Sequence, residues 1–292
     1  MRLTSKAAAL AATFLVASPV VVLAPRALAQ AAAPAPSAED ARLTTFLDAE
    51  FSQEVASRPQ LATRLGLKEN EDKLDDNSEA AQLKRLEWRR GSVARMKAQF
   101  DRAKLSPTAQ ASYDIWALEL ARAETNYKYR RYQPPFYSFL YSVHTELPNF
   151  LINTHVVKDA GDMTAYSARL RAFPQALDVA IGQERESSAM GVRAPRFEVE
   201  RVISGSKTLI TGAPFDAGPD SPLWADAKAK VGRLQAAGSV TPQQAEQLLA
   251  EARTSMLGIK PAYERVIAWG QSELPTAPSG RTGAISLPGG AE

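Results

Sequence analysis

The sequence YSARLRAFPQALDVAI, residues 166–181, decides the fold class. Its large apolar side chains follow one another at spacings of four, three, four and four residues: Tyr166, Leu170, Phe173, Leu177 and Ile181. Because an α-helix turns once in about 3.6 residues, this spacing places them on one helical face. We expect Pro174 to bend this helix and Gly191 to end it. Alternation with a period of two, typical of a half-buried strand, is not sustained over a strand length.

Capping residues predict where other helices begin. Ser37, with Asp40 three residues later, is typical of a helix N-terminus, and Ser78 precedes a second long helical pattern. Three further starts combine a capping hydroxyl with a proline suited to the first helical turn: Ser106-Pro107, Ser221-Pro222 and Thr241-Pro242. A short helix over 60–65 should end at Gly66, and another should follow Pro195.

These patterns predict an all-α protein with one multi-helix domain of about seven or eight helices over residues 37–274. Residues 127–151 combine many aromatic side chains with three prolines, so we expect one long aromatic-rich connection there. Residues 211–222 are a surface loop by composition. Residues 275–292 are rich in proline and glycine and read as a tail.

The N-terminal residues predict export. Arg2 and Lys6 precede an apolar run over 7–23, and Ala27 and Ala29 are the small residues that a signal peptidase reads. Cleavage is expected between Ala29 and Gln30, which makes residues 1–29 a signal peptide and 30–36 a disordered spacer. A retained membrane anchor is the alternative, but prolines interrupt the run. We therefore expect a periplasmic or secreted protein with no stable membrane span after cleavage.

The net charge of the mature chain argues against a nucleic-acid partner. The full sequence has 35 basic and 32 acidic residues, a formal net charge of +3. Three of the basic residues, Arg2, Lys6 and Arg26, belong to the predicted signal, which contains no acidic residue. The mature chain is therefore balanced, and nothing attracts it to a polyanion.

The chain has two histidines, His144 and His155, and no cysteine. Most metal centres and activated nucleophiles use these residue types, so we assign no catalytic residue, no metal ligand and no cofactor to this chain. His144-Thr145-Glu146 resembles the His-x-Glu of zinc deaminases, which also need cysteines. Each histidine is interpreted as a hydrogen-bonded loop residue.

Two other sequence patterns are interpreted as solvent-exposed segments without a catalytic or metal-binding role. Ser204-Gly205-Ser206-Lys207 has the spacing of a Ser-x-x-Lys nucleophile, but the companion motifs of that class are missing. Residues 68–77 are acidic but lack the glycine and spacing of an EF-hand loop. We expect a helix surface and a solvated loop respectively.

The aromatic segment supplies the weak candidates for a cleft or contact surface: Tyr137, Tyr141, His144 and His155. Aromatic side chains at this density usually close the open end of a helical core, and this interpretation is favoured. A ligand platform is the alternative.

Several stretches taken in order carry a family resemblance. They are residues 59–66 (PQLATRLG), 72–76 (DKLDD), 105–107 (LSP), 112–114 (SYD), 166–174 (YSARLRAFP), 195–197 (PRF) and 283–290 (GAISLPGG). In these stretches the chain resembles the N-terminal half of the bacterial family called "domain of unknown function 885".

The resemblance implies an exported, all-helical protein similar to zinc metallopeptidases. In such proteins a His-Glu-x-x-His helix supplies the metal ligands and the general base, and it lies in the C-terminal half. No residue of this sequence matches that motif, so zinc is implied only for full-length members. We therefore expect a truncated chain, by gene disruption, frame error or natural splitting, with a peptide substrate or the missing C-terminal half as its partner.

Two hypotheses about function remain. The chain is either the N-terminal half of a metallopeptidase-like enzyme, inactive by itself, or a stand-alone periplasmic helical binding or scaffold module. The genomic DNA just downstream distinguishes them, because only the first hypothesis requires a continuation encoding His-Glu-x-x-His.

Overall fold

The computed structural model describes residues 37–292 except 137, 139–141, 281–282, 284–286 and 291–292. Helices account for its regular structure, and the described residues contain no strand, only an isolated bridge between Ala213 and Asp220. The predicted all-α fold is confirmed. The predicted signal peptide with Ala27, Ala29 and Gln30, and the candidates Tyr137 and Tyr141, lie outside the described residues.

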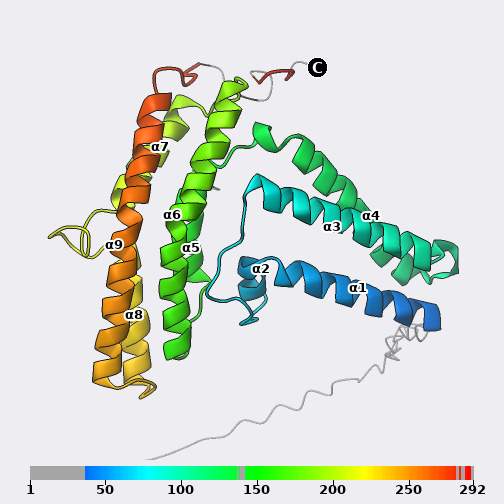
Figure 1. The fold of residues 1–292 in the computed structure, drawn as a ribbon, viewed down its shortest axis with the longest axis horizontal. Helices are drawn as coiled ribbons and strands as arrows, with labels where there is room; N and C mark the ends of the chain where they lie inside the picture. The colour runs from blue at the N-terminus through cyan, green and yellow to red at the C-terminus, as the bar shows by residue number, and fades with distance from the viewer. Residues whose placement is uncertain (1–36, 137, 139–141, 281–282, 284–286, 291–292) are drawn as a thin grey trace, which may run out of the picture. The chain divides into compact units, whose positions relative to one another are not determined.

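Nine α-helices and two short 3-10 helices follow one another in the described part of the chain (Figure 1). They are α1 (Ala38–Ala56), α2 (Pro59–Arg64), α3 (Glu79–Gln99), η1 (Arg102–Lys104), α4 (Pro107–Lys128), η2 (Arg130–Tyr132), α5 (Val143–Asn153), α6 (Ala160–Ala189), α7 (Arg196–Leu209), α8 (Pro222–Ala236) and α9 (Pro242–Glu273). None of them is both long and apolar enough to cross a membrane.

The larger core forms where α6 packs along α9, and α7 and α8 pack on α9 in turn. Figure 1 shows α6 and α9 side by side. The predicted face of α6 is buried in the structure. It consists of Tyr166, Leu170, Phe173, Leu177 and Ile181. Burying one such side chain contributes about 1.5–3 kcal/mol, so each residue of this face stabilises the packing of α6. The helix continues without a break through Pro174.

A second core joins α1, α3 and α4 around Leu43, Met96 and Phe100. Not every apolar residue of the helical patterns points inward. On α7, Phe197 is 50% exposed, whereas Val199 and Val202 are buried. Two residues correspond to about 200° of helical turn, so Phe197 and Val199 lie on opposite faces.

The capping predictions are confirmed at the atomic level. Ser37 and Thr241 form reciprocal capping boxes with the residues three positions later. The side chains of Ser78, Ser106 and Ser221 each accept a hydrogen bond from a backbone amide in the first turn of α3, α4 and α8. Local sequence therefore determines where these helices begin.

The aromatic connection is shorter than the sequence predicts, because residues from Val143 onward form helix α5, which contains Pro148. The sequence patterns do not predict this helix. Proline has no N–H, so the carbonyl of His144 lacks its usual partner four residues later. The Tyr263 hydroxyl of α9 donates to that carbonyl at 2.8 Å in the interior. A tertiary contact thus replaces the hydrogen bond that Pro148 removes.

Candidate functional site

A strap formed by residues 72–77 runs along α6 and is tied to it at two points. The Arg169 Nε donates to the carbonyl of Lys73 at 2.9 Å, and the Gln183 Nε2 donates to the carbonyl of Asn77 at 2.7 Å. These two anchors are fourteen residues apart on α6, about 21 Å at 1.5 Å per residue. The strap is therefore held along some four turns of the helix.

A cleft of about 760 Å³ lies between the strap and the helices α5 and α6. Its apolar lining includes small side chains of α6 at helical spacing, namely Ala172, Ala176, Val179 and Ala180, and Val143 and Leu147 of α5. Its polar lining includes the strap and the side-chain amides of Gln60, Gln82, Gln175 and Gln183. This volume and this mixture of an apolar wall with polar groups are typical of ligand sites.

Two of the four carboxylates that line the cleft are held by neighbouring groups. Asp75 accepts the backbone N–H of Gln60 at 2.8 Å and lies 3.6 Å from the Arg58 guanidinium. Asp76 accepts the N–H of Ser78 at 2.8 Å, and this hydrogen bond lowers the pKa of Asp76. Both carboxylates are therefore held in place and support the strap.

The other two cleft carboxylates are less constrained. Asp72 is exposed and interacts electrostatically with the buried Arg169 guanidinium. Glu146 is half-buried in the first turn of α5, and within the described residues its carboxylate has no ion pair and no hydrogen bond. The sequence offered no reason to single out Glu146 as a cleft residue, because the cleft joins segments far apart in the chain.

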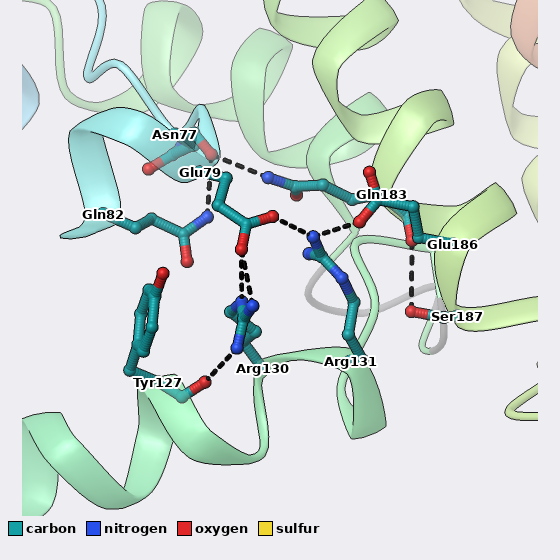
Figure 2. A network of polar contacts seen from close by, with 9 residues as sticks. All are labelled: Asn77, Glu79, Gln82, Tyr127, Arg130, Arg131, Gln183, Glu186 and Ser187. Carbon is teal, nitrogen blue, oxygen red and sulfur yellow. Dashed lines mark hydrogen bonds and ion pairs between the residues drawn. The ribbon is translucent and has the colours of Figure 1, made fainter. Parts of the chain in front are cut away.

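The polar network of Figure 2 borders one end of the cleft, because Asn77, Gln82 and Gln183 belong to both. The Asn77 carbonyl accepts hydrogen bonds from both Gln82, at 2.8 Å, and Gln183. Next to it, Glu79 of α3 pairs with Arg130, whose Nε is 3.1 Å away, and with Arg131. The hydrogen bond from Arg130 lowers the pKa of Glu79.

Arg131 carries this network across to α6, where it pairs with Glu186 (Figure 2). The start of α3, the segment after α4 and the C-terminal half of α6 are thus joined by charged groups. Pairs of exposed charges contribute little singly, but Arg131 is largely buried and shared between two carboxylates. The network therefore fixes the position of this end of the cleft.

The structure places His155 in the interior, beside Arg169, and not in the cleft. A guanidinium only donates hydrogen bonds, so the His155 Nδ1 accepts from Arg169 at 2.7 Å and its Nε2 donates to the carbonyl of Asp162 at 2.9 Å. Burial lowers the pKa of His155 to about 4, so the ring is neutral. Arg169 also donates to Thr63 Oγ1 at 2.7 Å, which ties α2 to α6.

His144 is also buried, at the start of α5. Its Nδ1 lies 2.5 Å from the Ser142 hydroxyl, and its ring contacts Phe136 with centroids 5.9 Å apart. Its Nε2 lies against Gly205 of α7, where an added Cβ would be 3.2 Å away. Burial lowers the pKa of His144 to about 4. Neither histidine lines the cleft, and a contact role for the aromatic segment stays a prediction.

Neither of the other motifs forms a reaction centre in the described residues. On α7 the Ser204 hydroxyl donates to the carbonyl of Arg201 at 3.1 Å, and Ser204 and Lys207 are exposed, as expected of a helix surface. Within the described residues no three His, Asp or Glu side chains come together as a metal site. The His, Asp and Glu side chains of the described residues therefore do not fit a zinc site, and we assign no zinc-dependent reaction step to them.

A buried carboxylate that the sequence does not single out follows the cleft residue Gln183 on α6. Glu184 of α6 is 1% exposed and accepts the backbone N–H of Phe136. Phe136 packs in turn on Trp269 of α9, with ring centroids 4.8 Å apart. Burial raises the pKa of Glu184 to about 8, and the nearby negative charge of Glu273 adds to this shift. Glu184 is therefore protonated at neutral pH.

Comparisons with known proteins agree with this all-helical architecture. The crystal structure described as "the putative lipoprotein from Colwellia psychrerythraea" is similar, with a TM-score of 0.70 and 14% sequence identity. The similarity covers 87% of this chain and 44% of that chain, so this chain spans less than half the length of the solved structure. No curated protein matches the sequence. The model of a family described as "Bacterial protein of unknown function (DUF885)" matches residues 59–292, and the chain belongs to this family.

Proposed function

We propose that this chain is the polypeptide-binding part of an exported, metallopeptidase-like protein, and that the cleft beneath the strap holds an extended segment of the substrate. The observation that carries the proposal is the cleft itself, about 760 Å³, whose lining combines apolar side chains of α5 and α6 with side-chain amides. Among these amides, that of Gln175 makes no hydrogen bond within the described residues. Apolar walls accept side chains, and amides exchange hydrogen bonds with a peptide backbone.

We assign substrate binding to this chain and zinc chemistry to a second half because of what the described residues contain. They provide a cleft but no group of metal-ligating side chains. The similar solved structure is more than twice as long as the part that this chain matches, which leaves room for a second half in a protein of this architecture. Zinc chemistry, which the family resemblance implies, would then belong to that half, and this chain would be inactive alone.

Export is part of the same proposal. Residues 1–29 would act as the signal peptide, with cleavage between Ala29 and Gln30, and residues 37–274 would form the helical domain ahead of the tail at 275–292. Mass spectrometry of the chain recovered from the exporting cell tests the cleavage site directly. A mature N-terminus at Gln30 is expected, and retention of residues 1–29 would contradict it.

A stand-alone binding or scaffold module of the cell envelope is the second candidate. It is favoured by the buried cores that the described residues form without another chain. The DNA just downstream of the coding sequence separates the candidates. A continuation encoding His-Glu-x-x-His, in phase or frame-shifted, supports the enzyme half, and its absence together with a monomeric, cooperatively unfolding chain supports the module.

Binding in the cleft is tested with the full chain, expressed with its own leader. Fluorescence anisotropy of labelled, extended peptides measures affinity, and Ala176→Trp fills the cleft from its α6 wall. Ala111→Trp, at an exposed position of α4, is the matched control. We expect Ala176→Trp to weaken binding about tenfold or more and Ala111→Trp to leave it unchanged. Equal affinity in both variants, or no binding by the wild type, would overturn the proposal.

A further inference from the structure

We infer that the cleft selects polypeptide segments that carry a basic side chain, and that Glu146 of α5 receives the cation. The inference rests on the proposed function and adds a substrate class to it. It starts from an imbalance of charge in the lining, where four carboxylates face two cations, Lys73 and Arg85.

The cations of the lining do not neutralise Glu146. Lys73 directs its Nζ to the Asn70 side chain, 2.8 Å away, and Arg85 donates to the carbonyl of Asp76 at 2.6 Å. Arg85 interacts electrostatically with Asp75 and Asp76, which belong to the strap. Glu146 is thus left as a half-buried carboxylate without a positive partner in the described residues.

A carboxylate in this setting favours a cation from outside. Partial burial removes some of its water without supplying an ion pair, and Val143 and Leu147 of the same helix line the wall beside it. A ligand ammonium or guanidinium would restore the missing interaction in a medium that screens charge less than water does. Asp72, exposed on the strap, adds a second negative charge to the same cleft.

The rest of the lining suits a polypeptide. The small residues of α6, Ala172, Ala176 and Val179, leave room for apolar side chains. Gln175, also on α6, has no hydrogen bond to its side chain within the described residues and is available to a peptide backbone. A basic residue next to an apolar one matches the carboxylate and the apolar wall together.

The test uses three labelled peptides that differ only at a central residue, which is Lys, Gln or Glu, and measures their affinity for the full chain. The wild type is expected to bind the Lys peptide about five- to tenfold more tightly than the Gln peptide, and the Glu peptide most weakly. The Glu146→Gln variant should lose the preference for Lys while its affinity for the Gln peptide stays unchanged. The Glu146→Lys variant should prefer the Glu peptide.

Glu246→Gln is the matched control, because Glu246 is exposed on α9 and lies outside the cleft. It should keep the wild-type preference, and circular dichroism with thermal unfolding verifies that all variants fold. Equal binding of the Lys and Gln peptides by the wild type, with both lost in Ala176→Trp, would refute the inference and leave the proposed function standing. Absence of binding by all three peptides would refute both.

Discussion

Glu184 should make the stability of this protein fall between neutral and mildly alkaline pH. Its pKa is about 8 in the folded chain against an ordinary value of 4.5. Below pH 4.5 the carboxyl is protonated in both states. Between these values the unfolded chain releases a proton that the folded chain retains, so rising pH favours unfolding by about 1.4 kcal/mol per pH unit. Above pH 8 both states are ionised and the loss is complete.

The two buried histidines act in the opposite direction at lower pH. His144 and His155 have a pKa of about 4 in the fold against an ordinary 6.5. Between these values the unfolded chain binds two protons that the fold excludes, so stability falls as the pH falls below 6.5. Because the histidines outweigh Glu184 there, stability should be greatest near pH 6.5. From there to pH 8 Glu184 alone should remove about 2 kcal/mol.

The substitution Glu184→Gln tests this reasoning, because glutamine keeps an acceptor for the Phe136 amide but has no titratable carboxyl group. Urea unfolding followed by circular dichroism from pH 5 to 9 gives the free energy of unfolding of each variant. Half of the unfolded imidazoles are still protonated at pH 6.5, and their loss of protons by pH 8 offsets part of the Glu184 effect. The wild type should therefore lose about 1 kcal/mol between pH 6.5 and 8, while Glu184→Gln gains about 1 kcal/mol. Glu246→Gln, at an exposed site, should follow the wild type. Parallel profiles for wild type and Glu184→Gln over this range would refute the reasoning.

Three further substitutions test single contacts by urea unfolding. Tyr263→Phe leaves the carbonyl of His144 without its donor and should cost about 1–3 kcal/mol. The cost should shrink in a Pro148→Ala background, where the residue 148 amide takes over, and an equal cost in both backgrounds would contradict our account. Arg169→Met should cost about 3 kcal/mol or more and increase amide exchange in residues 72–77, because the strap loses one anchor; unchanged exchange there would contradict the anchoring. Thr241→Ala removes the capping box of α9 and should lower the free energy of unfolding by about 1 kcal/mol. An unchanged free energy of unfolding would contradict a stabilising role for this cap.

Local features of this fold could be predicted because local residues determine them. Ser37, Ser78 and Thr241 cap helices using amides only three residues away, and the buried face of α6 follows from its own spacing. The helix α5 could not be predicted in this way. Its proline is tolerated because of Tyr263, whose hydroxyl reaches a carbonyl 119 residues earlier in the chain.

The candidate site could not be predicted from the sequence for a similar reason. The sequence indicates the histidines and the aromatic residues as candidates, yet His155 lies in the interior and accepts a hydrogen bond from Arg169. Glu146 became a candidate only when its helix was placed opposite the strap. The acidic composition of residues 68–77 predicts a solvated loop and gives no sign that the segment is tied to a helix about a hundred residues away.

The way in which the strap is fastened has a consequence for how this cleft can evolve. Arg169 and Gln183 hold main-chain carbonyls, which every amino acid possesses, so the hydrogen bonds do not depend on which side chains the strap carries. Apart from Asp75 and Asp76, whose own carboxylates support the strap, its residues can therefore change the chemistry of the cleft without releasing the backbone. In a lineage whose substrates change, we expect residues 72–74 to diverge while Arg169 and Gln183 are kept, and a designer can exchange these strap residues by the same logic.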